Sequence, residues 1–240
     1  MDKLQVYNLF RKNKKLKKGK LLTFEGLDGS SKETQTNNLI SYLEKEGYKV
    51  LKVDFPNYDS PIGEVISSYL RGEFGKLEDV PLKLISMVYS SDRARYANTI
   101  ENHIKNGGVV IANRYTYSNL FHAAKMEKEE RTEFIDWIEE IEFNEMKVFQ
   151  PDYNFYLYVD PTISLKRIEE RGKRGYQEGK EDIHENNSKL LIDTAETYLD
   201  FAKSRDNWVI IDQMKKGKQL PIDVVFEMIK DEVNKILIEE

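Results

Sequence analysis

Short apolar runs alternate with longer helix-patterned segments along the whole chain, and this alternation constrains the fold more than any other feature. Five runs rich in apolar and β-branched residues span residues 20–25, 49–55, 108–113, 153–160 and 208–212. Between the first two runs, Leu39, Ile40 and Leu43 share one helical face, and Gly47 provides a stop. Strands that alternate with helices form parallel sheets covered on both faces. The chain is therefore predicted to adopt an α/β fold, with a five-stranded parallel sheet flanked by helices.

The length and composition indicate one domain. The chain has 240 residues, of which 40% are hydrophobic, and no internal repeat or low-complexity linker divides it. We predict a single domain over residues 21–240, preceded by a basic extension at residues 1–20. The extension lacks the apolar core of a secretory signal and is interpreted as a solvated segment. An arm that binds a partner or nucleic acid is the alternative interpretation.

Charge and residue usage exclude several classes of protein. The net charge is −5, so no overall positive field favours nucleic acid as the main partner. The absence of cysteine excludes disulfides and thiolate metal sites, and no apolar run approaches the ~20 residues of a membrane span. These features fit a cytoplasmic protein that binds small anionic molecules rather than nucleic acid or a membrane.

The segment FEGLDGSSKETQT, residues 24–36, resembles a loop that holds phosphates. The template is Gly, four residues, then Gly-Lys-Ser/Thr at the start of a helix, whose N–H groups and positive end attract an anion. Gly26 and Lys32 match it, whereas Ser31 and Glu33 replace the second Gly and the hydroxyl. An ordinary strand-to-helix turn is the alternative. The predicted ATP-binding residues are Gly26, Leu27, Asp28, Gly29, Ser30, Ser31, Lys32, Glu33 and Thr34.

Further segments match one family in the same order along the chain. After FEGLDGSSKETQ come FPNYDSPIG, VYSSDR, NRYTYSN and KRGYQEGKEDIHE, which together extend over roughly residues 20–212. This ordered set resembles the thymidylate kinase family. The resemblance implies a P-loop nucleoside monophosphate kinase fold, ATP and Mg²⁺ as donor and cofactor, dTMP as acceptor, a basic lid at about residues 171–185, and a homodimer.

The expected catalytic residues are those that place positive charge around the transferring phosphoryl group. Phosphoryl transfer depends mainly on positioning and charge. Lys32 would hold the donor phosphates, Asp28 would face the acceptor, and Arg114 would form a fork to the acceptor phosphate. A surface ion pair is the alternative for Arg114. The resemblance adds the lid cations, with solvated surface as their alternative: Arg171, Lys173, Arg174 and Lys180.

The base pocket is predicted from two side chains on one helix. Tyr89 and Arg93 are four residues apart, so one can stack on a base while the other hydrogen-bonds its edge. A core position is the alternative for Tyr89 and for Phe55. The resemblance puts Phe55 beside the base, Tyr58 near the sugar or phosphate, Asn119 at the polar edge of the base, and Tyr115 along the sugar pocket. The predicted substrate-binding set is Asp28, Phe55, Tyr58, Tyr89, Arg93, Asn113, Arg114, Tyr115, Asn119, His122 and His184.

Three positions depart from the family pattern. Ser31 adds a Cβ where phosphate would lie, Glu33 brings a carboxylate near polyphosphate, and Asn113 replaces an Asp. We hypothesise that Glu33 takes over the metal ligation that Asn113 has lost, and Glu185 is the second candidate metal ligand. Two alternatives stay open. One is a kinase for another nucleoside monophosphate, since histidines replace tyrosines at 122 and 184, and the other is a catalytically weakened nucleotide-binding regulator.

Overall fold

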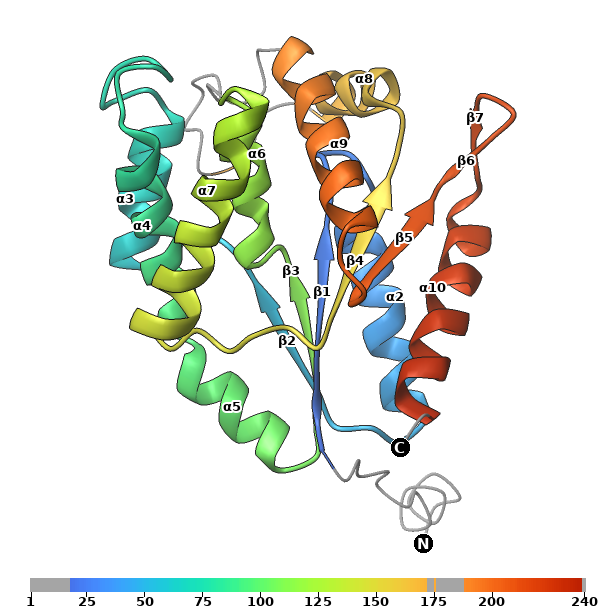
Figure 1. Ribbon diagram of the computed structural model, residues 1–240. Coiled ribbons are helices and arrows are strands. Elements are labelled where there is room, and N and C mark those ends of the chain that lie inside the picture. Colours follow the sequence, from blue (N-terminus) through green and yellow to red (C-terminus); the bar gives the residue numbers. More distant parts are fainter. Residues whose placement is uncertain (1–17, 172–174, 176–187, 239–240) are drawn as a thin grey trace, which may run out of the picture.

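The computed structural model describes residues 18–171, 175 and 188–238 (Figure 1). Nearly all of the basic extension and of the predicted lid therefore lies outside the described residues. In the part of the chain that is described, no helix combines the length and the apolar character that a membrane crossing requires.

The five predicted strands form and pair in one sheet. They are β1 (Lys20–Glu25), β2 (Val50–Asp54), β3 (Val109–Asn113), β4 (Tyr153–Tyr158) and β5 (Trp208–Asp212). Their order is β2-β3-β1-β4-β5, and every pairing is parallel, with β1 at the centre (Figure 1). The prediction of a five-stranded parallel sheet is confirmed. The loops that follow β1, β3 and β4 therefore meet at one edge, where ligands bind in such sheets.

Helices cover both faces of the sheet. The α-helices are α2 (Lys32–Lys45), α3 (Pro61–Leu70), α4 (Leu82–Ala94), α5 (Ala97–Lys105), α6 (Leu120–Ala123), α7 (Lys128–Glu139), α8 (Pro161–Arg171), α9 (Ser188–Lys203) and α10 (Ile222–Ile238). Shorter elements are the 3₁₀-helix η1 (Thr116–Asn119), the π-helix η2 (Glu140–Glu145) and the hairpin of β6 (Met214–Lys215) and β7 (Lys218–Gln219).

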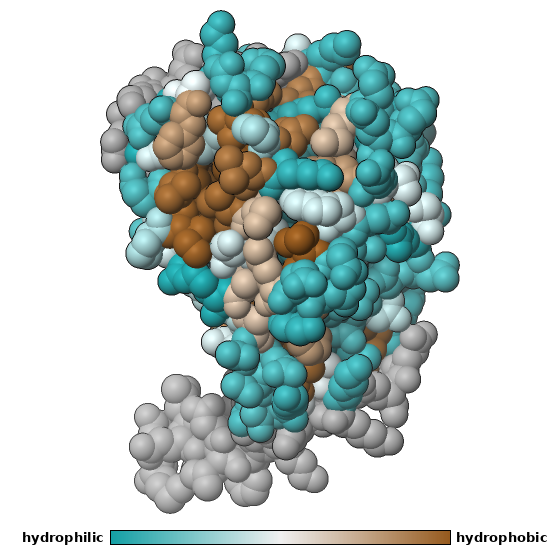
Figure 2. All heavy atoms as spheres, turned by 60° about the vertical axis from the view of Figure 1, so that its left-hand side comes forward, coloured by the Kyte–Doolittle hydropathy of each residue, from teal (hydrophilic) through white to brown (hydrophobic). Residues whose placement is uncertain are grey.

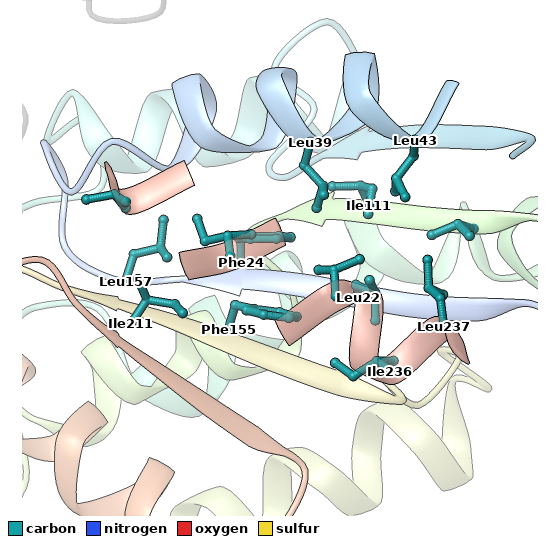
Figure 3. Packing of buried hydrophobic residues seen from close by; sticks show 14 residues of the cluster. Leu22, Phe24, Leu39, Leu43, Ile111, Phe155, Leu157, Ile211, Ile236 and Leu237 are labelled. Atoms are coloured by element: carbon teal, nitrogen blue, oxygen red, sulfur yellow. The ribbon is translucent and has the colours of Figure 1, made fainter. Parts of the chain in front are cut away.

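One face of the sheet packs on α2 and α10. Leu22 and Phe24 are two residues apart on β1, so both point to this face, where Phe24 stacks on Phe155 with ring centroids 4.9 Å apart. Leu39 and Leu43 of α2 cover them, together with Ile236 and Leu237 of α10 (Figure 3). The predicted apolar face of residues 32–47 is therefore the face that packs on the sheet.

The other face of the sheet carries α5, α7 and α9. Leu21, which alternates with Leu22, packs there against Ile100 and Ile104 of α5. Tyr156 of β4 stacks on Tyr198 of α9, with centroids 5.0 Å apart. This second layer brings α9 over the carboxyl end of β4, and so beside the loop that follows β1.

Local signals fix one end of each of two helices. The Ser60 hydroxyl accepts a hydrogen bond from the Gly63 N–H at 2.9 Å, and Pro61 occupies the first turn of α3. Gly47 follows α2 with φ 92°, a conformation that glycine adopts without strain. These caps hold α2 and α3 in the positions from which they reach the site.

Candidate active site

The glycine loop (residues 26–31) joins β1 to α2 at the carboxyl edge of the sheet. Gly26 has φ 143° and Gly29 has φ 75°, both in the region that favours glycine. A Cβ at Gly26 would lie 2.9 Å from the Leu157 carbonyl oxygen, so a larger residue would collide with β4. The loop leads into the amino end of α2, whose N–H groups can bind an anion. The predicted phosphate loop therefore has the required position and backbone.

The Lys32 side chain closes over this loop. Its ammonium donates to the carbonyl oxygens of Gly26 at 3.0 Å and Leu27 at 2.7 Å, and lies 3.3 Å from the Ser30 hydroxyl. The residue is only 7% exposed. A buried lysine that has neutral carbonyl partners is a strong anchor for a phosphate, because an anion offers it the charge that these carbonyls lack.

Arg114 and Asp28 form an ion pair across the edge of the sheet. Arg114 follows β3 with φ 65°, and its Nη2 lies 2.6 Å from Asp28 Oδ1. A second guanidinium nitrogen approaches the Gly26 carbonyl at 3.4 Å. The Asp28 carboxylate therefore faces the end of β3. About a quarter of each side chain is exposed, so a ligand can reach the pair.

Helix α8 supports the outer side of the glycine loop. Arg167 donates to the Gly29 carbonyl at 2.7 Å, and the Ser164 hydroxyl donates to the Asp28 carbonyl. A Cβ at Gly29 would lie 3.0 Å from the Arg167 Cβ. Sequence reasoning did not identify Arg167 or Ser164, because nothing in their local pattern indicates contact with a loop far away in the chain.

The central pocket lies beside the glycine loop, has a cavity volume of about 110 Å³ and is partly open to solvent. It is lined by these predicted site residues: Gly26, Leu27, Asp28, Phe55, Tyr58, Tyr89, Arg93, Arg114, Asn119 and His122. It is also lined by residues that were not predicted: Pro56, Leu70, Ser118, Phe121, Ile168, Leu191, Thr194 and Tyr198. Most of the predicted acceptor residues are therefore brought together.

The Arg93 guanidinium is fixed at the pocket by a buried carboxylate. Glu142 is 0% exposed and accepts from Arg93 Nε at 2.9 Å and Nη2 at 2.5 Å. It also accepts from Ser90 at 2.8 Å and Thr116 at 2.7 Å. Burial alone would lower the pKa of Arg93, but Glu142 outweighs burial and the pKa is raised. Arg93 therefore stays charged at the pocket wall.

Asn119 is oriented by the same carboxylate. Its amide nitrogen donates to the Thr116 carbonyl at 2.9 Å and to Glu142 Oε1 at 3.2 Å. Its amide oxygen lies 3.3 Å from His122 Nδ1, which is also 2.9 Å from the Ser86 hydroxyl. Because both amide hydrogens are used in the interior, the oxygen is the polar group that Asn119 can offer to a ligand.

Tyr89 and His122 form an aromatic wall of the pocket. Their ring centroids are 5.6 Å apart with an interplanar angle of 55°. Tyr89 is half-buried and His122 is 3% exposed. The spacing of Tyr89 and Arg93 on α4 indicated a shared face, and both side chains do line the pocket.

Glu25 is a buried carboxylate that sequence reasoning did not assign to the site. It accepts hydrogen bonds from the Tyr115 N–H at 2.8 Å, the Ser118 hydroxyl at 2.7 Å and the Tyr198 hydroxyl at 3.1 Å. Burial raises its pKa. It ties the end of β1 to α9 and to the turn after β3, where Arg114 stands. A carboxylate at the end of an apolar strand was the available signal.

Tyr115 corrects one expectation. It was expected to line the sugar pocket, yet it is 0% exposed and is not among the lining residues. Its hydroxyl donates to the Phe149 carbonyl at 3.0 Å, and its ring packs 5.7 Å from that of Phe55. An aromatic side chain that follows a central strand points into the core under the pocket when its hydroxyl finds a backbone partner there.

Asn113 also differs from its expected role at the substrate, because it lies outside the lining of the central pocket. Its amide nitrogen donates to Asp54 Oδ1 at 3.0 Å across the ends of β3 and β2. Its Oδ1 is buried and has no hydrogen-bond partner among the described residues. Asp54 is a carboxylate at this edge that sequence reasoning missed, although it directly precedes the Phe-Pro segment.

Glu33, the first candidate metal ligand, is exposed in the first turn of α2. Within the residues that the structure describes, no three His, Cys, Asp or Glu side chains are grouped closely enough to hold a metal ion. Of the remaining predicted residues, Arg171 ends α8 but its side chain is not described, and Lys173, Arg174, Lys180, His184 and Glu185 lie outside the described residues.

Comparison with known proteins finds matches over most of the chain. A family model described as thymidylate kinase matches residues 24–224. The thymidylate kinase of Plasmodium falciparum (isolate 3D7) is 31% identical over 217 residues, covering 90% of this chain and 93% of the relative. The thymidylate kinase of Thermosipho africanus (strain TCF52B) is 28% identical, and the match covers 90% of this chain and 98% of the relative. That of Mycobacterium tuberculosis (strain CDC 1551 / Oshkosh) is 26% identical, and the match covers 80% of this chain and 90% of the relative.

Proposed function

Because this chain belongs to the thymidylate kinase family, we propose that it transfers the γ-phosphoryl group of ATP to dTMP at the edge of its sheet. The reaction needs a donor site, an acceptor site and positive charge between them. The glycine loop with Lys32 supplies the first, the central pocket supplies the second, and Arg114 lies between the two.

On the donor side, Lys32 and the amino end of α2 bind the β- and γ-phosphates. The Lys32 ammonium contacts neutral oxygens of the loop itself, those of Gly26, Leu27 and Ser30. A phosphate that enters the loop replaces these partners with charged ones, so Lys32 needs to move little to engage it. Preorganised charge of this kind stabilises the transition state as negative charge spreads over the transferring oxygens.

On the acceptor side, Arg114 binds the phosphate of dTMP. Its guanidinium is held by Asp28 at 2.6 Å and by the glycine loop, so the fork is oriented before the substrate arrives. The Asp28 carboxylate remains on the acceptor side, where it can orient a sugar hydroxyl. The buried Glu25 network fixes the turn that carries Arg114, because it binds the backbone of Tyr115.

The single observation that favours thymine over cytosine is the donor and acceptor pair at the pocket wall. Arg93 offers a fixed donor and Asn119 offers its amide oxygen as acceptor. Thymine presents an oxygen acceptor beside its N–H donor, whereas cytosine presents an amino donor beside a nitrogen acceptor. The pair therefore complements thymine. With cytosine, the Arg93 donor would face the amino donor, and the Asn119 oxygen would face the ring nitrogen acceptor. Tyr89 supplies the stacking surface.

Mg²⁺ is proposed as the cofactor, and the residues at the carboxyl edge fit it. Mg²⁺ keeps most of its waters and takes one or two protein oxygens together with the phosphates of the nucleotide. The orphaned Oδ1 of Asn113 can accept a hydrogen bond from a metal-bound water, and the Asp28 and Asp54 carboxylates lie at the same edge. When bound, the ion neutralises charge on the β- and γ-phosphates.

The donor assignment is tested with Lys32→Ala. The variant is expected to fold, because the contacts it loses are loop hydrogen bonds, and to lose at least about a few hundredfold in kcat, since one missing charge in the transition state costs ~3 kcal/mol or more. ADP release from ATP in the presence of dTMP gives the rate. Lys45→Ala, on the exposed last turn of α2, is the matched control. Wild-type turnover in the Lys32 variant would refute the donor site.

A second copy of the chain is the proposed partner. Four large apolar side chains stand exposed on or beside α3 and α4, and Figure 2 shows apolar atoms gathered on the side of the molecule that carries these helices: Val65, Phe74, Leu84 and Met87, each at least 40% exposed. Such patches mark association surfaces. Leu84→Asp is expected to lower the mass measured by light scattering from dimer to monomer, and an unchanged dimer would contradict this. A cytoplasmic location stays a prediction.

A further inference from the structure

Ser31 holds a backbone conformation that its side chain disfavours. Its φ of 63° and ψ of 14° are left-handed, and this region is costly for residues other than glycine, with Asn and Asp tolerated best. It is the last residue before α2 and stands where the phosphate-loop template has glycine. Contacts elsewhere in the fold must therefore hold Ser31 in place, since its own preference does not.

Gln213, which follows the edge strand β5, makes those contacts. Its Oε1 lies 2.8 Å from the Ser31 hydroxyl, and its Nε2 donates to the Ser30 carbonyl at 3.0 Å. The Ser31 hydroxyl also lies 2.6 Å from the same Ser30 carbonyl. The hydroxyl has a single hydrogen, which it can donate either to the Ser30 carbonyl or to Gln213 Oε1. The hydrogen bond from Gln213 Nε2 to the Ser30 carbonyl does not depend on that choice.

Gln213 is itself held rigidly. It directly follows β5 and is 0% exposed. Its N–H donates to the Tyr158 carbonyl at 3.1 Å, and its carbonyl accepts from the Leu220 N–H at 2.8 Å. The Gln219 amide lies 3.3 Å from its Oε1. The end of β4 and the β6–β7 hairpin thus fix both its backbone and its side chain.

We propose that Gln213 is a positioning residue for the donor site. By binding the Ser30 carbonyl it turns that oxygen toward β5 and away from the interior of the glycine loop, so that N–H groups rather than carbonyls face an incoming phosphate. By binding Ser31 it supports the left-handed conformation that glycine would adopt unaided. Gln213 does not touch the reacting atoms. It acts through the backbone of residues 30 and 31.

This inference rests on the proposed donor role of the glycine loop, and it predicts a specific kinetic pattern. Gln213→Leu keeps the size of the side chain and removes both hydrogen bonds, so KM for ATP is expected to rise about tenfold, the equivalent of one or two buried hydrogen bonds. KM for dTMP is expected to change less than about twofold, because the central pocket is untouched.

Two substitutions at position 31 separate positioning from general stability. Ser31→Ala keeps the strained backbone and loses the hydroxyl, so it is expected to raise KM for ATP by about fivefold. Ser31→Gly relieves the strain, so its KM for ATP is expected to be lower than that of Ser31→Ala. Combined with Gln213→Leu, Ser31→Gly should recover most of the loss, because glycine does not need the support.

The matched control is Gln35→Leu. Gln35 is also 0% exposed, and its side-chain amide also ties α2 to the segment after β5, through the Ile222 carbonyl at 2.9 Å. Its hydrogen bond to the glycine loop, from its N–H to the Ser31 carbonyl at 3.0 Å, is made by the backbone and is kept in the variant. Gln35→Leu is expected to lower Tm without separating the two KM values. Equal shifts of both KM values in Gln213→Leu, or identical behaviour of Ser31→Ala and Ser31→Gly, would overturn the inference. Absence of ATP-dependent turnover in the wild type would instead refute the proposed function.

Discussion

Replacing Glu142 with Gln tests how the pocket holds its base-reading pair. The carboxylate accepts from five donors in a fully buried site. A Gln side chain offers one acceptor oxygen in place of two. Its amide hydrogens would face some of the groups that now donate to Glu142, so that donors would oppose donors. The Thr116 hydroxyl can turn and accept, but the Arg93 N–H groups cannot. The Arg93 charge would also lose its partner.

The magnitude follows from the loss of a buried charge pair. Removing one partner of such a pair costs about 3–5 kcal/mol in the free energy of unfolding. At about 2–4 °C per kcal/mol for a chain of this size, Tm is expected to fall by about 6–20 °C. Because Arg93 and Asn119 both lose their anchor, KM for dTMP is expected to rise by about tenfold or more, while KM for ATP stays within about twofold.

Differential scanning calorimetry and steady-state kinetics measure the two effects, and Glu139→Gln is the matched control. Glu139 lies three residues earlier and is about a quarter exposed, and within the described part of the chain its carboxylate accepts from Tyr117 at 3.0 Å and pairs with Arg205 at 3.4 Å. Its replacement should cost less than about 1 kcal/mol and leave both KM values unchanged. A Glu142→Gln variant that matches Glu139→Gln in Tm, or that raises KM for ATP as much as KM for dTMP, would refute the assigned role of Glu142.

Two further predictions concern the carboxylates at the edge of the sheet. If Glu33 compensates for Asn113, Glu33→Ser and Asn113→Asp should each impair Mg²⁺-dependent turnover, the latter because it sets a second carboxylate against Asp54. The double variant should recover activity, with a coupling energy of about 1–3 kcal/mol between the two sites. Strict additivity of the two single effects would refute compensation. A separate prediction concerns Glu25, whose pKa burial raises above its ordinary 4.5. Between pH 4.5 and the raised pKa, the folded chain keeps a proton that the unfolded chain has lost. The free energy of unfolding therefore falls as pH rises through this window. Relative to Glu25→Gln, the free energy of unfolding of the wild type, measured by denaturant titration, should fall by up to about 1.4 kcal/mol per pH unit across this window. Parallel plots of the free energy of unfolding against pH for the two proteins would contradict a buried carboxylate with a raised pKa.

The sheet and the glycine loop could be predicted because their signals are local. Leu22 and Phe24 alternate with polar or oppositely directed neighbours on β1, and Leu39 and Leu43 recur at helical spacing. The residues that pack together can therefore be identified from the spacing within short segments. Gly26 and Lys32 likewise belong to one segment with its own geometry. Short-range spacing also placed Tyr89 and Arg93 on one side of α4.

The partners of these residues could not be predicted, because they come from distant segments. Gln213 meets Ser31 across 182 positions of sequence, and Glu142 meets Arg93 across 49. Glu142 also lies in a π-helix, whose wider turn shifts its side chain from the position that α-helical spacing predicts. Tyr115 was misplaced for a related reason, since its hydroxyl finds the Phe149 carbonyl only after the fold has formed.

The most direct test of the proposed activity is a coupled ADP-release assay on the purified chain with ATP and Mg²⁺ and one acceptor at a time: dTMP, dUMP, UMP, CMP, GMP or dGMP. Membership of the thymidylate kinase family predicts the highest kcat/KM for dTMP, and the donor and acceptor pair of Arg93 and Asn119 predicts that dTMP is preferred to CMP. CMP should be at least about a hundredfold poorer, because two unmatched hydrogen bonds at the base edge cost ~3 kcal/mol or more. Equal turnover of CMP and dTMP, a purine nucleotide as the best acceptor, or no ADP release with any acceptor would contradict the assignment.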